Sequence, residues 1–349
     1  MPCQALARAI AKIAPSDGVV TLPSGLARAS IVSLCSALLL ATSDPVAAQA
    51  SGDAPTIEEI TVIGRYPGPP LWKVTSGART LWIFGELTPV PKGLEWDPRN
   101  AERVLDRAGG VIGGPRVSAM TLNPIRLFRL YRAARKLVRL PEDTTLADQM
   151  PPELYARYTA LRARYLPKVK DDDEDMRPAL AALRVYGAAL DDAGLTMDSD
   201  VGKKIERKMR RSRAEEADVL VETEPETVIE DLKKVTPEAE LACFESTLAS
   251  IETDLEGMKE RANAWAIGDV DALKRFDYPD SQGNCLQALL SAPGFVELRD
   301  ELYAKWLGEA EHALATYDTS FSVLPMRELV AADGLLAQLA ARGYTVTAP

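Results

Sequence analysis

The chain has 349 residues, of which 46% are hydrophobic and 26% are charged, so it can bury a sizeable core and is not disordered throughout. Its 41 basic and 51 acidic residues give a formal net charge of -10. Nucleic acid is excluded as a general partner, because an acidic chain lacks the excess of cations that displaces counterions from it.

The N-terminal region has the features of an export signal. Arg28 precedes an apolar run, residues 31–42, that is too short to span a bilayer as a helix. Ala48-Gln49-Ala50 then offers small residues around a cleavage site. We predict a signal peptide over residues 1–50, cleaved after Ala50, and a periplasmic or secreted chain that is not a transmembrane protein. The long stretch before the apolar run leaves open a true start downstream of Met1.

A linker and a hairpin follow the signal. Residues 51–69 are polar at first and rich in proline and glycine at the end, which predicts a flexible linker. Its segment IEEITVIG could pair as an edge strand. Two short alternating runs, residues 71–75 and 80–85, flank the turn sequence SGA and predict a β-hairpin. A helix over about residues 98–108 comes next, with Asp97 as its N-cap.

Residues 109–114, GGVIGG, predict a short apolar strand. These glycines do not form a phosphate loop, because no Lys-Ser/Thr pair follows them.

A basic amphipathic helix is predicted over residues 124–140. The apolar side chains expected on its inner face are Leu127, Leu130, Tyr131, Ala134, Leu137 and Val138. The cations around the other face are Arg126, Arg129, Arg132, Arg135, Lys136 and Arg139. Such a helix could contact an anionic surface, such as lipid head groups or an acidic partner. Alternatively, its arginines could pair with nearby acids.

The rest of the chain alternates long helices with a few strands. Helices are predicted over residues 151–166, 176–193, 203–213, 237–267, 269–276, 294–316 and 327–343, the last ended by Gly343. Strands are predicted over residues 217–223, 319–325 and 344–349. Strands thus concentrate at the two ends around a helical middle. We predict an α/β fold, with a central mixed β-sheet built from N- and C-terminal strands and a large helical insertion.

Cleavage after Ala50 would remove Cys3 and Cys35 and leave Cys243 and Cys285. An even pair in an exported protein predicts one disulfide between them. The alternative is two buried thiols. A zinc site is disfavoured, because two cysteines at this spacing lack histidine partners.

Several segments resemble the TraB/PrgY/GumN family, which is related to Tiki-like metalloproteases. Residues 71–93, LWKVTSGARTLWIFGELTPVPKG, are similar to its opening motif, a strand leading to Gly-Thr-x-His and a proline turn. Residues 321–346, FSVLPMRELVAADGLLAQLAARGYTV, are similar to its second motif, a strand leading to Gly-x-x-His. The segments RPALAALRVY, VLVET and ERANAWAIGDVDAL are similar to its central part. The resemblance covers about residues 70–349 and implies one domain over this range.

The departures from the family pattern concern its metal ligands. The first motif falls on Gly85 to Thr88, where Thr88 replaces the histidine. The second falls on Pro325 to Glu328, where Glu328 replaces the histidine. A glutamate of the family would fall near Gly114. Because metal-dependent peptidase activity in that family is attributed to the two histidines with acidic partners, the resemblance implies a divergent member with vestigial motif positions.

Three carboxylates remain as weak catalytic candidates. Glu86, Glu222 and Glu328 could converge if the fold is that of the family, and with water they would suit Mg²⁺, Mn²⁺ or Ca²⁺. Each also has a plainer interpretation. Glu86 could be a surface turn residue, Glu328 a first-turn acid favoured by the helix dipole, and Glu222 a partner for an arginine. The sole histidine, His312, lies within a predicted helix and is interpreted as a half-exposed surface residue.

The function expected from these residues is non-catalytic. We expect an exported pseudo-metallopeptidase that binds or scaffolds a peptide, polysaccharide or envelope protein, without a resident metal or cofactor. Trp72, Trp82 and Trp96 could line a pocket for a peptide or sugar, or simply pack in the core. The alternative is a metal-dependent hydrolase or peptidase with a centre made only of carboxylates and Mn, Mg or Ca as its metal.

Overall fold

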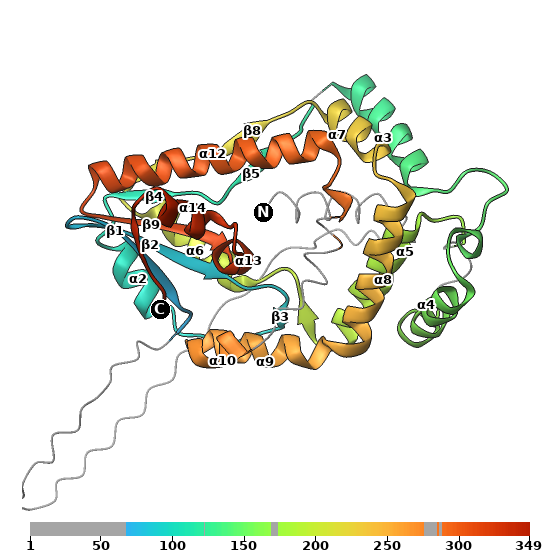
Figure 1. Cartoon of the computed structure of the whole chain (residues 1–349), viewed down its shortest axis with the longest axis horizontal. Helices are drawn as coiled ribbons and strands as arrows, with labels where there is room; N and C mark the ends of the chain where they lie inside the picture. The colour runs from blue at the N-terminus through green and yellow to red at the C-terminus, as the bar shows by residue number, and fades with distance from the viewer. Residues whose placement is uncertain (1–67, 122, 169–173, 276–284, 286–287) are drawn as a thin grey trace, which may run out of the picture. The chain divides into compact units, whose positions relative to one another are not determined.

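The computed structural model describes residues 68–121, 123–168, 174–275, 285 and 288–349 (Figure 1). The predicted signal peptide and cleavage site lie outside these residues, and so does the linker, with its proposed edge strand, up to residue 67.

A six-stranded mixed sheet confirms the predicted α/β class. β1 is antiparallel to both β2 and β10, whereas β2, β9, β4 and β7 run parallel. The sequence predicted a sheet built from N- and C-terminal strands, and in the structure strands from the two ends of the described chain are direct neighbours. Across the sheet the order is β10 (Thr345–Thr347), β1 (Leu71–Ser76), β2 (Arg79–Glu86), β9 (Thr319–Pro325), β4 (Gly110–Ile112) and β7 (Glu215–Ala217).

Helices cover the sheet and complete its core. The last four residues of β2, from Ile83 to Glu86, are all buried, which is typical of a strand covered on both faces. Trp306 is fully buried, and its Nε1 donates to Ser322 Oγ on β9 at 3.2 Å. The helices in this core are α2 (Arg99–Leu105), α6 (Asp200–Arg211), α9 (Leu255–Ala266), α10 (Val270–Arg275), α12 (Pro293–Thr316), α13 (Met326–Val330) and α14 (Leu335–Ala341).

The predicted helical insertion is also confirmed, and it has a hydrophobic cluster of its own. Tyr158, Val185, Phe244 and Leu248 are fully buried in that cluster. The remaining helices among the described residues are α3 (Pro124–Val138), the 3-10 helix η1 (Leu146–Gln149), α4 (Pro152–Tyr165), α5 (Pro178–Asp192), α7 (Pro225–Lys233) and α8 (Pro237–Thr253). Two small sheets accompany them, β3 (Val90–Pro91) with β6 (Leu195–Thr196), and β5 (Arg116–Ser118) with β8 (Leu220–Glu222).

The predicted disulfide is present, because Cys243 is bonded to Cys285. Both residues are buried, and they share a small cluster with Ala179 of α5. No helix in the described part of the chain combines the length and the apolar sequence needed to cross a bilayer.

The predicted strand over residues 217–223 is wrong as a single element. Its first half ends β7, whereas its second half is β8 and pairs with β5 in another sheet. The amide of Arg116 at the start of β5 donates to the carbonyl of Val219 at 2.9 Å. The chain therefore leaves the large sheet after Ala217 to pair with β5.

Two predicted helices are divided. The helix over residues 237–267 breaks at Asp254, whose φ of -121° and ψ of -3° are not helical. The Asp254 carboxylate there accepts two bonds from the Arg261 guanidinium, at 2.8 and 2.5 Å. The helix over residues 327–343 is interrupted by Ala331, which is extended, and it resumes as α14.

The predicted helix over residues 98–108 is shorter, with Pro98 at the N-cap position in place of Asp97. The Asp97 carboxylate still accepts a bond from the Arg99 amide at 2.9 Å, so it satisfies one of the amides at the helix start.

The basic helix α3 forms where predicted, but its predicted inner face is wrong at two positions. No residue of α3 is buried, and Leu127 and Tyr131 are 59% and 46% exposed. Arg126 instead lies towards α7, where it pairs with Glu224 and Glu226. This tertiary ion pair outweighs the apolar periodicity and rotates the helix.

Candidate functional site

The two motifs meet at one edge of the sheet. β2 and β9 are parallel neighbours, and Glu86 at the end of β2 lies opposite Pro325 at the end of β9. Gly85 and Thr88 therefore share this edge with Glu328, which follows β9 in α13. The carboxyl ends of parallel strands are the usual place for ligands in α/β folds.

Gly85 is a position where only hydrogen fits. A Cβ there would lie 2.5 Å from Met326 Sδ, 2.7 Å from the Trp72 ring and 2.8 Å from Leu329 Cδ1. The Gly85 carbonyl accepts a hydrogen bond from Trp265 Nε1 at 2.8 Å. The glycine of the first motif therefore allows four side chains to close around the strand end.

Glu86 is buried, with 7% of its surface exposed, so its interpretation as a surface turn residue is wrong. Its carboxylate lies against Gly202, and a Cβ at position 202 would collide with Glu86 Oε1. Gly202 belongs to the first turn of α6, which is capped by the Ser199 hydroxyl accepting from the Val201 amide at 3.1 Å. The Glu86 carboxylate therefore lies beside the first turn of a helix, the end at which the helix dipole favours a negative charge.

Glu328 is also held by neighbouring side chains. Its side chain is 14% exposed and accepts a hydrogen bond from the Tyr303 hydroxyl of α12. Arg327 Nε pairs with the other carboxylate oxygen at 3.0 Å. Burial, and after it the negative charge of Glu328, raise the pKa of Tyr303 well above its ordinary value. Tyr303 therefore remains a proton donor to Glu328.

Glu222 is not in this group. It lies in β8, which pairs with β5 in a separate two-stranded sheet, and its side chain is exposed. Among the described residues, no group of three or more His, Cys, Asp or Glu side chains is arranged to hold a metal ion.

The structure also describes the positions that depart from the family pattern and the sole histidine. Thr88 is half-buried and joined to Pro89 by a cis peptide bond. Gly114 is half-buried, and a Cβ there would meet the Val323 carbonyl at 3.3 Å. His312 is exposed on α12, rather than half-exposed as predicted, with its ring edge-on to Tyr317.

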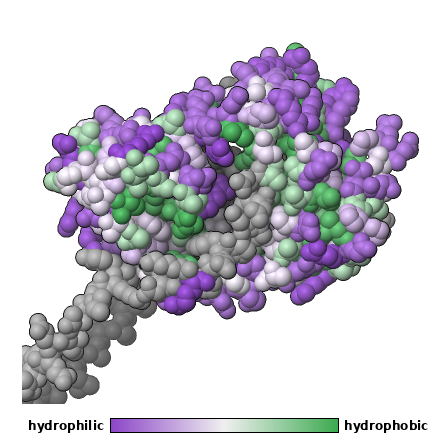
Figure 2. Space-filling model, viewed as in Figure 1, coloured by the Kyte–Doolittle hydropathy of each residue, from purple (hydrophilic) through white to green (hydrophobic). Residues whose placement is uncertain are grey.

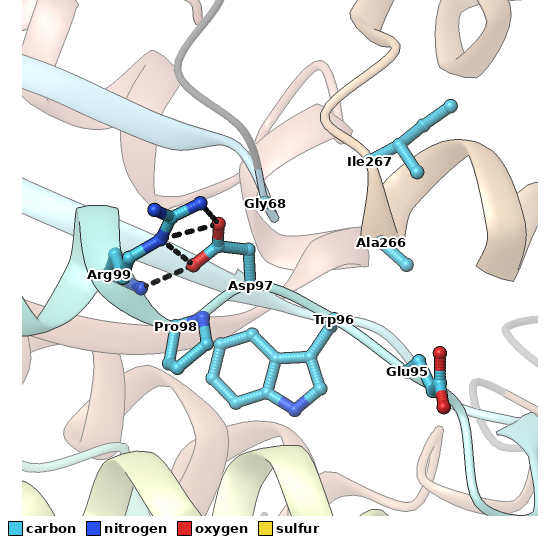
Figure 3. Close-up of a pocket in the computed structure, with 8 residues that line it drawn as sticks. All are labelled: Gly68, Glu95, Trp96, Asp97, Pro98, Arg99, Ala266 and Ile267. Carbon is cyan, nitrogen blue, oxygen red and sulfur yellow. Dashed lines mark hydrogen bonds and ion pairs between the residues drawn. The ribbon is translucent and has the colours of Figure 1, made fainter. Parts of the chain in front are cut away.

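A depression of about 540 Å³ lies next to the motif strand (Figure 3). Trp96 lines it, and the Trp96 ring centroid is 6.1 Å from that of Phe84 on β2. The other two tryptophans predicted to line a pocket lie elsewhere: Trp72 is buried under Gly85, and Trp82 is half-buried beside Lys73. The other residues around the depression are Gly68, Glu95, Asp97, Pro98, Arg99, Ala266 and Ile267.

Sequence reasoning missed two residues of this edge. Gly202 lay just before the predicted helix over residues 203–213, whereas α6 begins at Asp200, so nothing in the sequence singled out this glycine. Tyr303 carried no signal either, because its contact with Glu328 joins elements that are not adjacent in the sequence.

A family model described as the TraB/PrgY/gumN family matches residues 70–348. The chain therefore belongs to this family, which confirms the resemblance. The search of curated proteins and the search of solved structures found no match to this chain.

Proposed function

We propose that this member of the TraB/PrgY/gumN family is a non-catalytic binding or scaffold protein of the cell envelope. The observation that carries the proposal is that both carboxylates at the motif edge are already in contact with other groups of the protein. Glu86 lies against the first turn of α6, and Glu328 accepts from Tyr303 and Arg327.

A divalent cation would have to compete with these contacts. To bind Mg²⁺ or Mn²⁺, Glu86 would have to leave the N-terminus of α6, and Glu328 would have to give up its hydrogen bonds. Threonine at position 88 also offers a weaker donor than imidazole for a transition metal. The contacts at this edge therefore suit a structural role, in which they hold parts of the fold together, better than a metal centre.

An exported location agrees with the disulfide. A bond between Cys243 and Cys285 persists in oxidising compartments and is rare in the reducing cytosol. Together with the predicted signal over residues 1–50, it supports a periplasmic or secreted protein. The ligand or partner would be a peptide, a polysaccharide or an envelope protein. We place its contact in the depression beside Trp96, whose indole ring offers a stacking face.

The second candidate function is a metal-dependent hydrolase or peptidase with a carboxylate centre. It is favoured by the position of Glu86 and Glu328 at the ends of two adjacent parallel strands. In that case the two carboxylates would hold Mg²⁺, Mn²⁺ or Ca²⁺ with water as the remaining ligands.

Metal content and peptide hydrolysis distinguish the two functions. Both would be measured for the wild type and for Glu86→Gln and Glu328→Gln, purified without chelator or affinity metal. Glu256→Gln is a matched control, because the Glu256 side chain on α9 is 80% exposed. The binding function predicts that Glu86→Gln and Glu328→Gln lower stability and leave metal content and hydrolysis equal to those of the control. A stoichiometric metal that both variants lose, together with hydrolysis, would establish the enzyme instead.

A further inference from the structure

Exposed apolar side chains gather at one place on the described surface. Eight large hydrophobic residues are exposed, and five of them lie between positions 120 and 131. These five are Met120, Ile125, Leu127, Phe128 and Tyr131, with exposed fractions from 46% to 78%. All except Met120 belong to α3, so the exposed large apolar side chains are concentrated on this helix and the loop before it.

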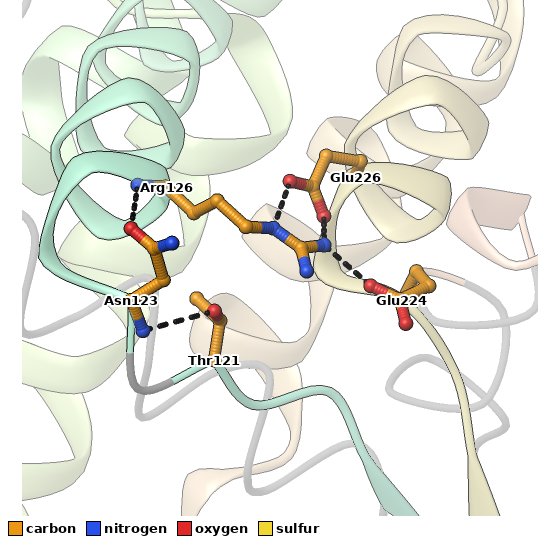
Figure 4. A network of polar contacts seen from close by, with 5 residues as sticks. All are labelled: Thr121, Asn123, Arg126, Glu224 and Glu226. Atoms are coloured by element: carbon orange, nitrogen blue, oxygen red, sulfur yellow. Dashed lines mark hydrogen bonds and ion pairs between the residues drawn. The ribbon is translucent and has the colours of Figure 1, made fainter.

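The orientation of α3 is fixed from its inner side (Figure 4). Arg126 Nε donates to Glu226 Oε1 at 2.9 Å, and its Nη2 reaches both Glu226 and Glu224 at the start of α7. The Asn123 side chain caps the helix by accepting from the Ile125 and Arg126 amides. Because residues advance by roughly 100° each around a helix, Phe128, Arg132 and Arg135 lie on the side opposite Arg126.

The cations of this outer face are not neutralised by the protein. Within the described chain, Arg132, Arg135 and Lys136 form no ion pair, although Arg135 lies over the Tyr131 ring at 5.9 Å; Arg129, nearer to Arg126, interacts electrostatically with Glu226. The second basic helix, α6, differs in this respect. Three of its cations pair with acids, namely Lys203 with Asp198, Lys208 with Asp106 and Arg210 with Glu206. In Figure 2 the region where Figure 1 draws α3 and α7 is mostly hydrophilic.

We propose that α3 docks the protein on an anionic phospholipid surface, with Phe128 and Ile125 inserted at the interface and the flanking cations on the phosphates. An interfacial helix of this kind combines apolar side chains with arginines whose long stems let the charge stay in the head-group layer. Nucleic acid fits less well, because the chain carries a net charge of -10 and insertion of apolar side chains has no use there. The proposal is independent of whether the motif edge is catalytic.

An acidic protein groove is the closest rival. It would match the cations equally well, but it would need a clean apolar stripe facing it. On α3 the apolar and cationic side chains alternate around the same outer face, with Ile125 and Phe128 beside Arg132 and Arg135. At a membrane surface the long stems of arginines can lie beside inserted apolar side chains while their charges stay in the head-group layer, so a mixed face can be received there.

Vesicle sedimentation tests the proposal with the full chain. The two probes are phosphatidylcholine vesicles and vesicles that contain about 30% phosphatidylglycerol, because anionic lipid supplies the attraction for a basic segment. The apolar run at residues 31–42 and the basic residues before it are the same in every variant, so a change between variants in the preference for the anionic vesicle measures α3. We expect binding that requires phosphatidylglycerol and falls as salt shortens the Debye length.

Two pairs of exposed substitutions should reduce this preference. Each interfacial cation contributes about fivefold to the partition constant, so Arg132→Gln with Arg135→Gln should reduce it at least tenfold. Ile125→Ser with Phe128→Ser should give a loss of at least the same size. All four side chains are exposed, so the fold should tolerate these changes, and circular dichroism checks it.

The matched controls are Leu183→Ser, at an apolar side chain that is 36% exposed on α5, and Arg210→Gln on α6. Both should bind as the wild type does. Equal binding of the wild type to the two vesicles, or undiminished binding of the α3 variants, would overturn the proposal. So would binding to soluble polyglutamate in place of vesicles, which would indicate an acidic protein partner.

Discussion

Replacing Gly202 with alanine tests whether the first turn of α6 holds the Glu86 carboxylate. The two residues come from distant parts of the chain, and a Cβ at position 202 would occupy the place of Glu86 Oε1. Glu86 is buried, so it cannot move aside into solvent without opening the motif edge. The added methyl group must therefore displace either the carboxylate or the helix.

Opposing effects determine how much Gly202→Ala changes the free energy of unfolding. Alanine favours a helix over glycine by about 0.5–1 kcal/mol. Overpacking a buried site costs about 1–3 kcal/mol, and loss of the favourable position at the helix N-terminus adds about 0.3–1 kcal/mol. Gly202→Ala should therefore lower the free energy of unfolding by about 2 kcal/mol. In a Glu86→Ala background the collision is gone, and the same change should raise it by about 0.5–1 kcal/mol.

Urea unfolding followed by tryptophan fluorescence measures this cycle. All five tryptophans lie in or against the core of the sheet, so the signal reports the part of the protein that contains Glu86. Gly308→Ala on α12 is the control, because a Cβ there meets nothing within 4 Å, and it should stabilise both backgrounds equally. If Gly202→Ala stabilises the protein containing Glu86 as much as Gly308→Ala does, the contact between Glu86 and α6 is refuted.

Three further predictions concern single contacts. Tyr303→Phe should cost about 1–2 kcal/mol at neutral pH, because Glu328 loses a donor. Burial raises the pKa of Tyr303, so the contribution of its hydroxyl to stability is complete below the unfolded pKa of about 10 and is lost as the pH rises above that value. The urea midpoints of the wild type and of Tyr303→Phe should therefore converge at high pH. A difference that stays constant with pH would contradict the hydrogen bond from Tyr303 to Glu328. Reduction of the bond between Cys243 and Cys285, which are 42 positions apart, should cost about 4 kcal/mol, and a peptide map without reductant should show the two cysteines linked rather than as free thiols. Arg177→Met should cost about 3–5 kcal/mol, because it leaves Glu240, 8% exposed, without its partner; adding Glu240→Gln should recover most of the lost thermal stability, and no recovery would argue against the pair.

The strands of the sheet could largely be predicted from the sequence, because their signals are local. The hairpin around SGA and the strand over residues 319–325 lie where the alternation of apolar and polar residues, and the turn residues that bound them, predicted them. That strands from both ends share one sheet followed from the order of the predicted elements, whereas no pattern in the sequence indicated that β9 pairs directly with β2. The helical middle was also visible, because helix periodicity persists over long windows.

Two of the errors share one physical cause, a contact with a distant residue. Arg126 turns α3 because α7 carries Glu226 opposite it. Glu86 looked like a turn residue because its neighbour in the structure, the first turn of α6, is more than a hundred positions away. Local propensity carries no information about any of these partners.

The same contacts explain why a motif edge can persist without its histidines. Glu86 joins the N-terminal hairpin to α6 of the central segment, and Glu328 joins the C-terminal helix α13 to α12. Gly85 lets Trp72, Met326 and Trp265 close over the same strand end. Substituting any of these residues would disturb packing between parts of the chain that are far apart in sequence, whether or not a metal ever binds. The edge is therefore constrained by the stability of the fold, and the retained motif residues do not by themselves indicate catalysis.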